Sequence, residues 1–140
     1  MSTTPVGPPS PRPLSAGLLA GPFLFVSGQV PVDLQTGRVS GQDIEEQTRR
    51  ALGNLAGVLA AAGLALGDVV KTTVFLTDIK DFNAMNEVYR ELFSPPFPTR
   101  STVQVAALAA PEMRVEIEAI ALRRDQPARV EGESGGNRAR

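Results

Sequence analysis

The sequence predicts an α+β fold in which a single mixed β-sheet carries two helices on one of its faces. Segments rich in β-branched and aromatic residues alternate with two segments whose apolar residues recur at helical spacing. Their order along the chain is strands, helix, strand, helix, strand, strand, which is typical of this class. The chain has 140 residues, 42% of them hydrophobic, which is enough for one core. We therefore expect one domain.

The two ends of the chain differ in composition from the middle. Residues 1–13 contain five prolines, so we expect a flexible segment that stays out of the sheet interior. Residues 124–140 are polar and Gly-rich, which predicts a disordered tail. The folded domain then covers residues 14–123. The start resembles no signal peptide and residues 51–66 are too short to span a bilayer, so we expect a cytoplasmic protein with no membrane partner.

The first elements follow from local composition. Phe23–Ser27 is a predicted strand, and Gly28 after it allows a bulge or a close approach of the backbone. Residues 31–37 contain turn-forming residues, and Arg38–Val39 is expected to start a short return strand.

Asp43 is expected to begin the first helix, because Glu46 follows three residues later as in a capping box. Gly63 is a good residue for the end of this helix. The apolar residues at helical spacing are Ile44, Ala51, Leu52, Leu55, Val58, Leu59 and Ala62.

Residues 69–77 form a β-branched segment with apolar residues on both faces, as a central strand has. The second helix begins near residues 78–81 and ends before Pro95 and Pro96. Its buried stripe is Phe82, Met85, Tyr89, Leu92 and Phe93. Ser101–Leu108 and Met113–Leu122 are the last two predicted strands.

Both faces of the predicted central strand carry apolar residues, but two helices on one side of the sheet cover only one of these faces. Alternation places one set of its side chains on one face and a second set on the other. The first set is Val70, Thr72, Val74 and Leu76, and the second is Val69, Thr73 and Phe75. Self-association would bury the uncovered face, so we expect a symmetric homo-oligomer.

Two absences restrict the chemistry. The sequence has no Cys and no His, which excludes thiol nucleophiles, imidazole bases and metal sites built on either residue. A hard cation held by carboxylates stays possible, but no loop has Ca²⁺-type spacing, so we expect no metal. With 14 basic and 15 acidic residues the net charge is −1, so no basic field is available for a nucleic acid.

Several polar residues are candidates for a site. Glu116 and Glu118 are two residues apart on one predicted strand, so their side chains share a face of the sheet. Either this face is solvated, or one of the two carboxylates lies in a pocket and acts as a general base. Arg100 follows Pro98 and is either a surface charge or a fork that binds a carboxylate. Asn86 flanks the buried stripe of its helix, and the amides after Ser27 form either a turn or an anion site.

Four strings of the sequence together resemble the Rid/YjgF reactive-intermediate deaminase family. They are SGQVP, VVKTTVFLTD, PTRS and EIEAIA, in order within Phe23–Leu122. The resemblance implies a fold like the Bacillus chorismate mutase and a homotrimer with active sites between subunits. It also implies hydrolysis of 2-imino acids, released by pyridoxal-phosphate enzymes, to 2-keto acids and ammonia without a cofactor.

The resemblance also assigns roles to residues. Arg100 matches an arginine that binds the substrate carboxylate, and Glu116 matches a glutamate that activates water, with Glu118 as the alternative. Further residues that match the substrate-binding cleft are Ser27, Gly28, Asn86 and Thr102, the last at a position where many members have Cys. Many members also carry Gly-Pro-Tyr near the start, and the matching stretch here is Gly7-Pro8-Pro9, so that Pro9 replaces a tyrosine.

Strand geometry adds one expectation. If the last two predicted strands formed a tight hairpin, Arg100 would lie roughly 17 Å from Glu116, too far to share one small substrate. We therefore expect that these strands are not direct partners, or that the two residues meet across a subunit boundary.

Two other functions stay open. One is a small-carboxylate-binding regulatory protein with little turnover. The other is an RNA-cleaving or translation-inhibiting role, which the near-zero net charge and the absence of His disfavour.

Overall fold

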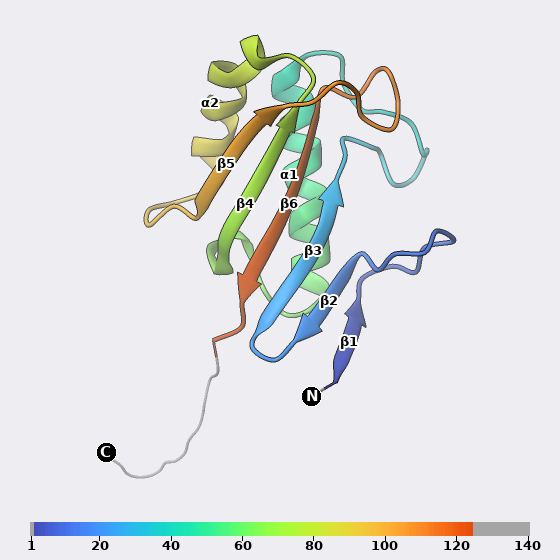
Figure 1. The fold of residues 1–140 in the computed structure, drawn as a ribbon, viewed down its shortest axis with the longest axis vertical. Coiled ribbons are helices and arrows are strands. Elements are labelled where there is room, and N and C mark those ends of the chain that lie inside the picture. Colours follow the sequence, from blue (N-terminus) through green and yellow to red (C-terminus); the bar gives the residue numbers. More distant parts are fainter. Residues whose placement is uncertain (1, 125–140) are drawn as a thin grey trace.

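A computed structural model describes residues 2–124 and shows one six-stranded sheet (Figure 1). The strand order is β1-β2-β3-β6-β4-β5. Only β4 and β5 are parallel; the other neighbours are antiparallel, so the sheet is mixed as predicted. The strands are β1 (Thr3–Val6), β2 (Gly17–Ala20), β3 (Phe23–Gln29), β4 (Val69–Leu76), β5 (Thr99–Gln104) and β6 (Val115–Leu122).

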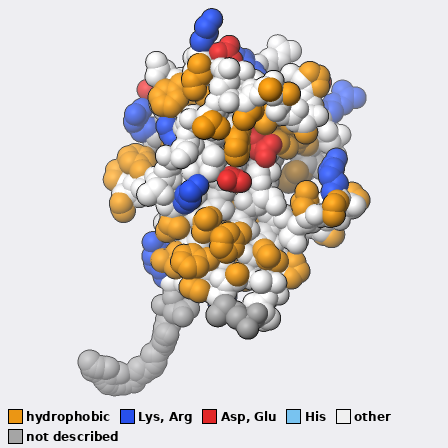
Figure 2. All heavy atoms as spheres, in the orientation of Figure 1, with side chains coloured by type: hydrophobic (Ala, Val, Ile, Leu, Met, Phe, Trp, Pro, Cys, Tyr) orange, Lys and Arg blue, Asp and Glu red, His pale blue; other side chains and the backbone are white. Residues whose placement is uncertain are grey.

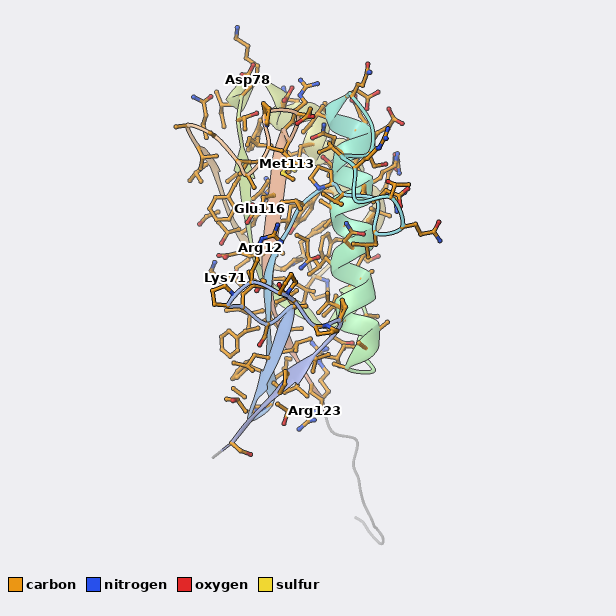
Figure 3. All side chains as sticks on the ribbon, turned by 90° about the vertical axis from the view of Figure 1, so that its right-hand side faces the viewer. Arg12, Lys71, Asp78, Met113, Glu116 and Arg123 are labelled. Atoms are coloured by element: carbon orange, nitrogen blue, oxygen red, sulfur yellow. The ribbon has the colours of Figure 1, made fainter. Side chains whose placement is uncertain are left out.

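Two α-helices, α1 (Ile44–Ala61) and α2 (Phe82–Leu92), cover the same face of the sheet (Figures 1 and 3). Two short 3-10 helices, η1 (Leu66–Asp68) and η2 (Ile79–Asp81), precede β4 and α2. The core lies between this face and the helices and includes fully buried residues from both. Within residues 2–124, none of the helices has the length and hydropathy needed to cross a membrane.

Helix α1 begins and ends as the sequence predicts. The side chain of Asp43 accepts a hydrogen bond of 2.8 Å from the backbone N–H of Glu46. Gly63 has φ +74°, a conformation that favours glycine just after a helix. The second helix also begins in the predicted range, with η2 leading into α2.

The Pro-rich N-terminal segment contributes one short strand, at the edge of the sheet and not in its interior. Residues Thr3–Val6 form this strand, β1, and pair with β2. An edge strand pairs on one side only, so Pro5 is tolerated there. Neither β1 nor β2 was predicted, because prolines, glycine and alanine have low strand propensity. The predicted tail lies outside the described residues except for Arg124.

The central strand β4 departs from regular alternation. Its register to β6 shifts between Val69 and Lys71, so Val69 is buried on the helix face at 5% exposure while Val70 is partly exposed. The predicted faces of these two valines are therefore reversed, although the remaining residues alternate as expected. The return strand predicted at Arg38–Val39 is reduced to a single bridge between Val32 and Val39.

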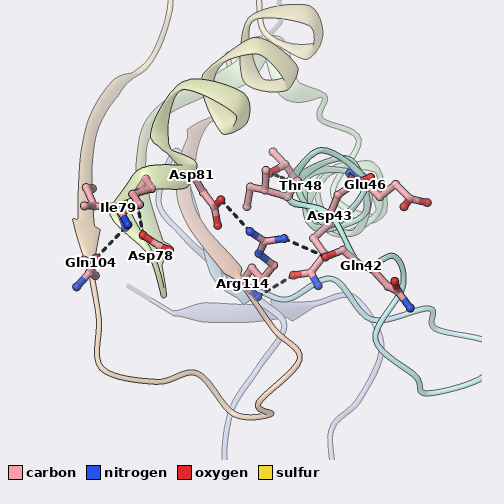
Figure 4. A network of polar contacts seen from close by, with 12 residues as sticks. Gln42, Asp43, Glu46, Thr48, Asp78, Ile79, Asp81, Gln104 and Arg114 are labelled. Atoms are coloured by element: carbon pink, nitrogen blue, oxygen red, sulfur yellow. Dashed lines mark hydrogen bonds and ion pairs between the residues drawn. The ribbon is translucent and has the colours of Figure 1, made fainter.

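The start of β6 is tied to both helices by Arg114 (Figure 4). Its guanidinium pairs with Asp81 before α2 at 2.9 Å and donates to the carbonyl of Gln42 before α1 at 3.0 Å. The backbone N–H of Arg114 donates to the side chain of Gln47 at 2.7 Å. Because these contacts join three elements, they fix the end of β6 from which Glu116 projects.

Candidate active site

Glu116 projects from β6 onto the sheet face that carries no helix, because Val115 and Ile117 on either side are buried in the core. Its carboxylate packs against the backbone of Gly28 at the end of β3. A Cβ added at residue 28 would lie 2.7 Å from the Cδ of Glu116. Only glycine leaves room for this contact, and the register of β3 to β6 is irregular in the same segment, between Val26 and Gln29.

Partial burial of Glu116 changes its acidity. Desolvation raises the pKa of its carboxyl group above the usual glutamate value, and the negative charge of Glu118 raises that pKa further. A carboxylate with a raised pKa is a better general base near neutral pH. This is the property that the sequence-based hypothesis required of one of the two glutamates.

Glu118 lies on the same face but has different surroundings. It is exposed and borders a cavity of about 400 Å³ together with Ser27, Lys71 and Thr73. The structure thus places Glu116, rather than Glu118, against the glycine at the end of β3.

Ser27 anchors the segment before β2. Its hydroxyl donates to the carbonyl of Ser15 at 2.6 Å, and its backbone N–H donates to the carbonyl of Ala16 at 2.9 Å. Gly7, by contrast, lies near the side chain of Val58 on α1. The stretch beside Ser27 is therefore residues 15–16, and the replacement of a family tyrosine by Pro9 stays a prediction.

Arg100 lies in a second pocket, at the edge of the sheet. Its guanidinium carbon sits 4.8 Å from the ring centroid of Tyr89 and 5.6 Å from that of Phe82, both on α2. None of the ion pairs among residues 2–124 involves Arg100. A pocket of about 220 Å³ is lined by Asn86, Tyr89, Arg90, Phe97, Pro98 and Arg100.

Two more predicted site residues lie on the same side of the sheet as Arg100. The Oγ1 of Thr102 and the Oδ1 of Asn86 are buried without a hydrogen-bond partner in the described structure. Buried polar atoms are almost always paired in folded proteins, so these two mark places where a ligand or water is expected to bind. Tyr89 donates to or accepts from the buried Thr72 hydroxyl at 2.7 Å and belongs to the core, as predicted.

The two groups of residues lie on opposite faces of the sheet. Arg100 pairs in register with Thr72, and that residue is buried under the helices. Glu116 pairs with Phe75, whose side chain points to the open face. The prediction that the last two strands are not direct partners is confirmed, since β4 separates them. Within one chain, a small substrate cannot contact both Arg100 and Glu116.

Sequence reasoning missed several residues that line the pockets, among them Arg90, Phe97 and Lys71. The sequence signal that could have identified two of them is their position next to residues already singled out. Arg90 follows the buried Tyr89, and Phe97 precedes the segment from Pro98 to Arg100. Among residues 2–124, no three acidic residues cluster in a way that could hold a metal ion.

Comparison with known proteins adds three relatives. A family model described as endoribonuclease L-PSP matches residues 6–123. The 2-iminobutanoate/2-iminopropanoate deaminase of Salmonella typhimurium is 44% identical over 115 residues, covering 80% of this chain and 88% of the relative. The human protein of the same description is 40% identical over 120 residues, covering 86% and 87%. The structure of Escherichia coli TdcF with bound serine has a TM-score of 0.79 and 41% identity, covering 86% of this chain and 99% of that one.

Proposed function

We propose that this chain, which belongs to the endoribonuclease L-PSP family, hydrolyses 2-imino acids to 2-keto acids and ammonia. The relatives described as 2-iminobutanoate/2-iminopropanoate deaminases support this substrate class. The observation that carries the proposal is the pair of incomplete sites: a cationic pocket around Arg100 and a partly buried carboxylate, Glu116, on the opposite face.

The complete site forms between two copies of the chain in a homotrimer. The open face exposes large apolar side chains, including Phe23, Phe25 and Val103 at 39%, 44% and 42%. Figure 2 shows apolar side chains around a few charged ones on this face. A surface of this kind is expected to be covered by another subunit. The edge strand β5 of one copy then brings Arg100 to the Glu116 face of its neighbour.

Arg100 binds the substrate carboxylate. Its planar guanidinium offers two parallel N–H groups to the two oxygens, and the rings of Tyr89 and Phe82 hold it in place. The unpartnered oxygens of Asn86 and Thr102 lie on the same side and are available to the rest of the ligand. Binding at fixed orientation presents the imine carbon to the neighbouring subunit.

Glu116 performs both proton transfers. As a carboxylate it accepts a proton from water while the water oxygen forms a bond to the imine carbon and the C=N π electron pair moves to nitrogen. The protonated Glu116 then gives this same proton to the nitrogen and becomes a carboxylate again. The product of this step is a tetrahedral amino alcohol. Glu116 and the solvent then move a proton from the hydroxyl to the amine, the C–N bond breaks, and ammonia leaves a C=O group. The raised pKa of Glu116 suits a group that must take up and release a proton.

A coupled assay tests the proposal. An amino-acid oxidase generates the imine of alanine, and loss of this imine is followed with and without the protein. We expect acceleration by the wild type and at least a hundredfold loss of kcat/KM in Arg100→Ala and Glu116→Gln. Unchanged imine decay with wild-type protein would overturn the proposal. Saturable binding of 2-keto acids without acceleration would instead favour a binding protein.

A further inference from the structure

A second arginine, Arg90, lines the pocket around Arg100. This space of about 220 Å³ is also lined by Asn86, Tyr89, Phe97 and Pro98. Asn86 and Arg90 are one turn apart on α2, so they share the helix side that faces Arg100 on β5. No carboxylate contributes to the lining. The pocket therefore presents two positive charges where one would suffice to bind a single carboxylate.

The charge of Arg90 is only weakly neutralised. Its guanidinium lies 3.2 Å from the carboxylate of Glu87, one turn earlier, and the two side chains are 63% and 74% exposed. Exposed ion pairs of this kind contribute little stability. A ligand carboxylate inside the pocket can therefore take the place of Glu87.

The shape of the pocket limits the ligand. Pockets for drug-sized molecules have volumes of about 300–1,000 Å³, so a space of about 220 Å³ suits a smaller molecule. Tyr89, Phe97 and Pro98 line the same pocket, and the guanidinium of Arg100 lies 4.8 Å from the ring centroid of Tyr89. A compact molecule with two carboxylates a few bonds apart matches both charges.

We propose that Arg90 makes this site selective for 2-imino acids that carry a second carboxylate, that is, the imines of acidic amino acids. Arg100 binds the carboxylate next to the imine carbon, and Arg90 binds the carboxylate of the substrate side chain. This inference rests on the proposed function, since it names the substrate class of the same site.

The test compares two imines and two product analogues. The imines of alanine and of aspartate are generated with amino-acid oxidases, and the ratio of their kcat/KM values is measured for each variant. The ratio of dissociation constants for 2-oxobutanoate and 2-oxoglutarate is measured by calorimetry on the same proteins. The binding ratio needs no turnover, so it remains informative if the catalytic proposal fails.

Arg90→Gln should lower the preference for the second carboxylate about tenfold in both ratios, because it removes one charge-assisted hydrogen bond. Glu87→Gln removes the competing carboxylate and should raise the preference. Arg38→Gln loses the same charge in the loop before α1, away from this pocket, and should leave both ratios unchanged. Equal ratios in wild type and Arg90→Gln would overturn the inference. If neither imine is accelerated but Arg90→Gln still shifts the binding ratio, only the proposed reaction is wrong.

Discussion

The position of the Glu116 carboxylate depends on the absence of a side chain at Gly28. A methyl group at this position would lie within 2.7 Å of the Glu116 carboxyl carbon. We expect Gly28→Ala to displace the carboxylate and lower kcat/KM for imine hydrolysis at least tenfold, since small misplacements of a base are costly. Steady-state kinetics with the imine of alanine measures this.

Gly57 provides the matched control for this substitution. It lies in α1, and a Cβ added there meets no atom within 4 Å. Gly57→Ala should stabilise the protein by about 0.5–1 kcal/mol and leave the activity unchanged. If Gly28→Ala kept wild-type activity, the contact between Gly28 and Glu116 would have no catalytic importance.

The raised pKa of Glu116 predicts how activity depends on pH. Its acid form persists to a higher pH than in an ordinary glutamate, because burial and Glu118 both disfavour the charge. The acid limb of kcat/KM should therefore lie above the usual pKa of glutamate. In Glu118→Gln, one of the two causes is removed, and the limb should move to lower pH. An unchanged limb in this variant would contradict the account.

The same shift predicts an effect on stability. The folded protein binds the Glu116 proton more tightly than the unfolded chain, so this group contributes stability at low pH. That contribution is lost as the pH rises from the usual glutamate pKa through the higher pKa of the folded state. The glutamine in Glu116→Gln does not ionise. Urea unfolding should therefore show that the free energy of unfolding of this variant, relative to the wild type, rises across this pH window and stays higher at neutral pH. Parallel pH profiles of the two proteins would be inconsistent with the shift.

At the scale of elements, the capping bond of α1 is the clearest case in which a local pattern determines the structure. Asp43 accepts from Glu46 N–H at 2.8 Å. Asp43→Ala should lower the free energy of unfolding by about 1 kcal/mol, within the range of 0.5–2 kcal/mol for such caps. Asp33 is a control that lies in the preceding loop and caps no helix. Equal unfolding midpoints for wild type and Asp43→Ala would exclude a stabilising cap.

Local patterns predicted the long elements and failed at the short ones. The two helices and β3, β4 and β6 have strong apolar periodicity or β-branched composition, and these are features of neighbouring residues. The strands β1 and β2 form because they pair with β3 at the sheet edge, and their own residues favour loops. The bulge in β4 reversed the faces of Val69 and Val70, since alternation assumes a regular register.

The sequence predicted the site residues that match motifs of a known family. It did not predict those whose position depends on how the helices pack on the sheet in this chain. Arg100, Glu116 and Asn86 were all identified from the sequence, and the structure gives each a pocket or a close neighbour. Arg90 was missed, because its role depends on which side of α2 faces β5. Spacing along the chain does not contain this information.

At the scale of the whole molecule, the arrangement of the two faces is the central feature. One face is covered by helices and places Arg100 at its edge; the other is open and carries Glu116 among apolar side chains. Each chain therefore holds two half-sites that cannot meet each other. In the homotrimer that we propose, a three-fold axis would join each half-site to its complement in the next subunit.

Mixing two inactive variants tests this claim most directly. Arg100→Ala and Glu116→Gln are unfolded together, refolded at equal concentration, and assayed for imine hydrolysis, with size-exclusion chromatography to confirm that the oligomer forms. If the site lies between subunits, each mixed trimer regains one intact site, and the mixture should recover about a quarter of wild-type activity. If the mixture stays as inactive as either variant alone, Arg100 and Glu116 do not act across a subunit boundary.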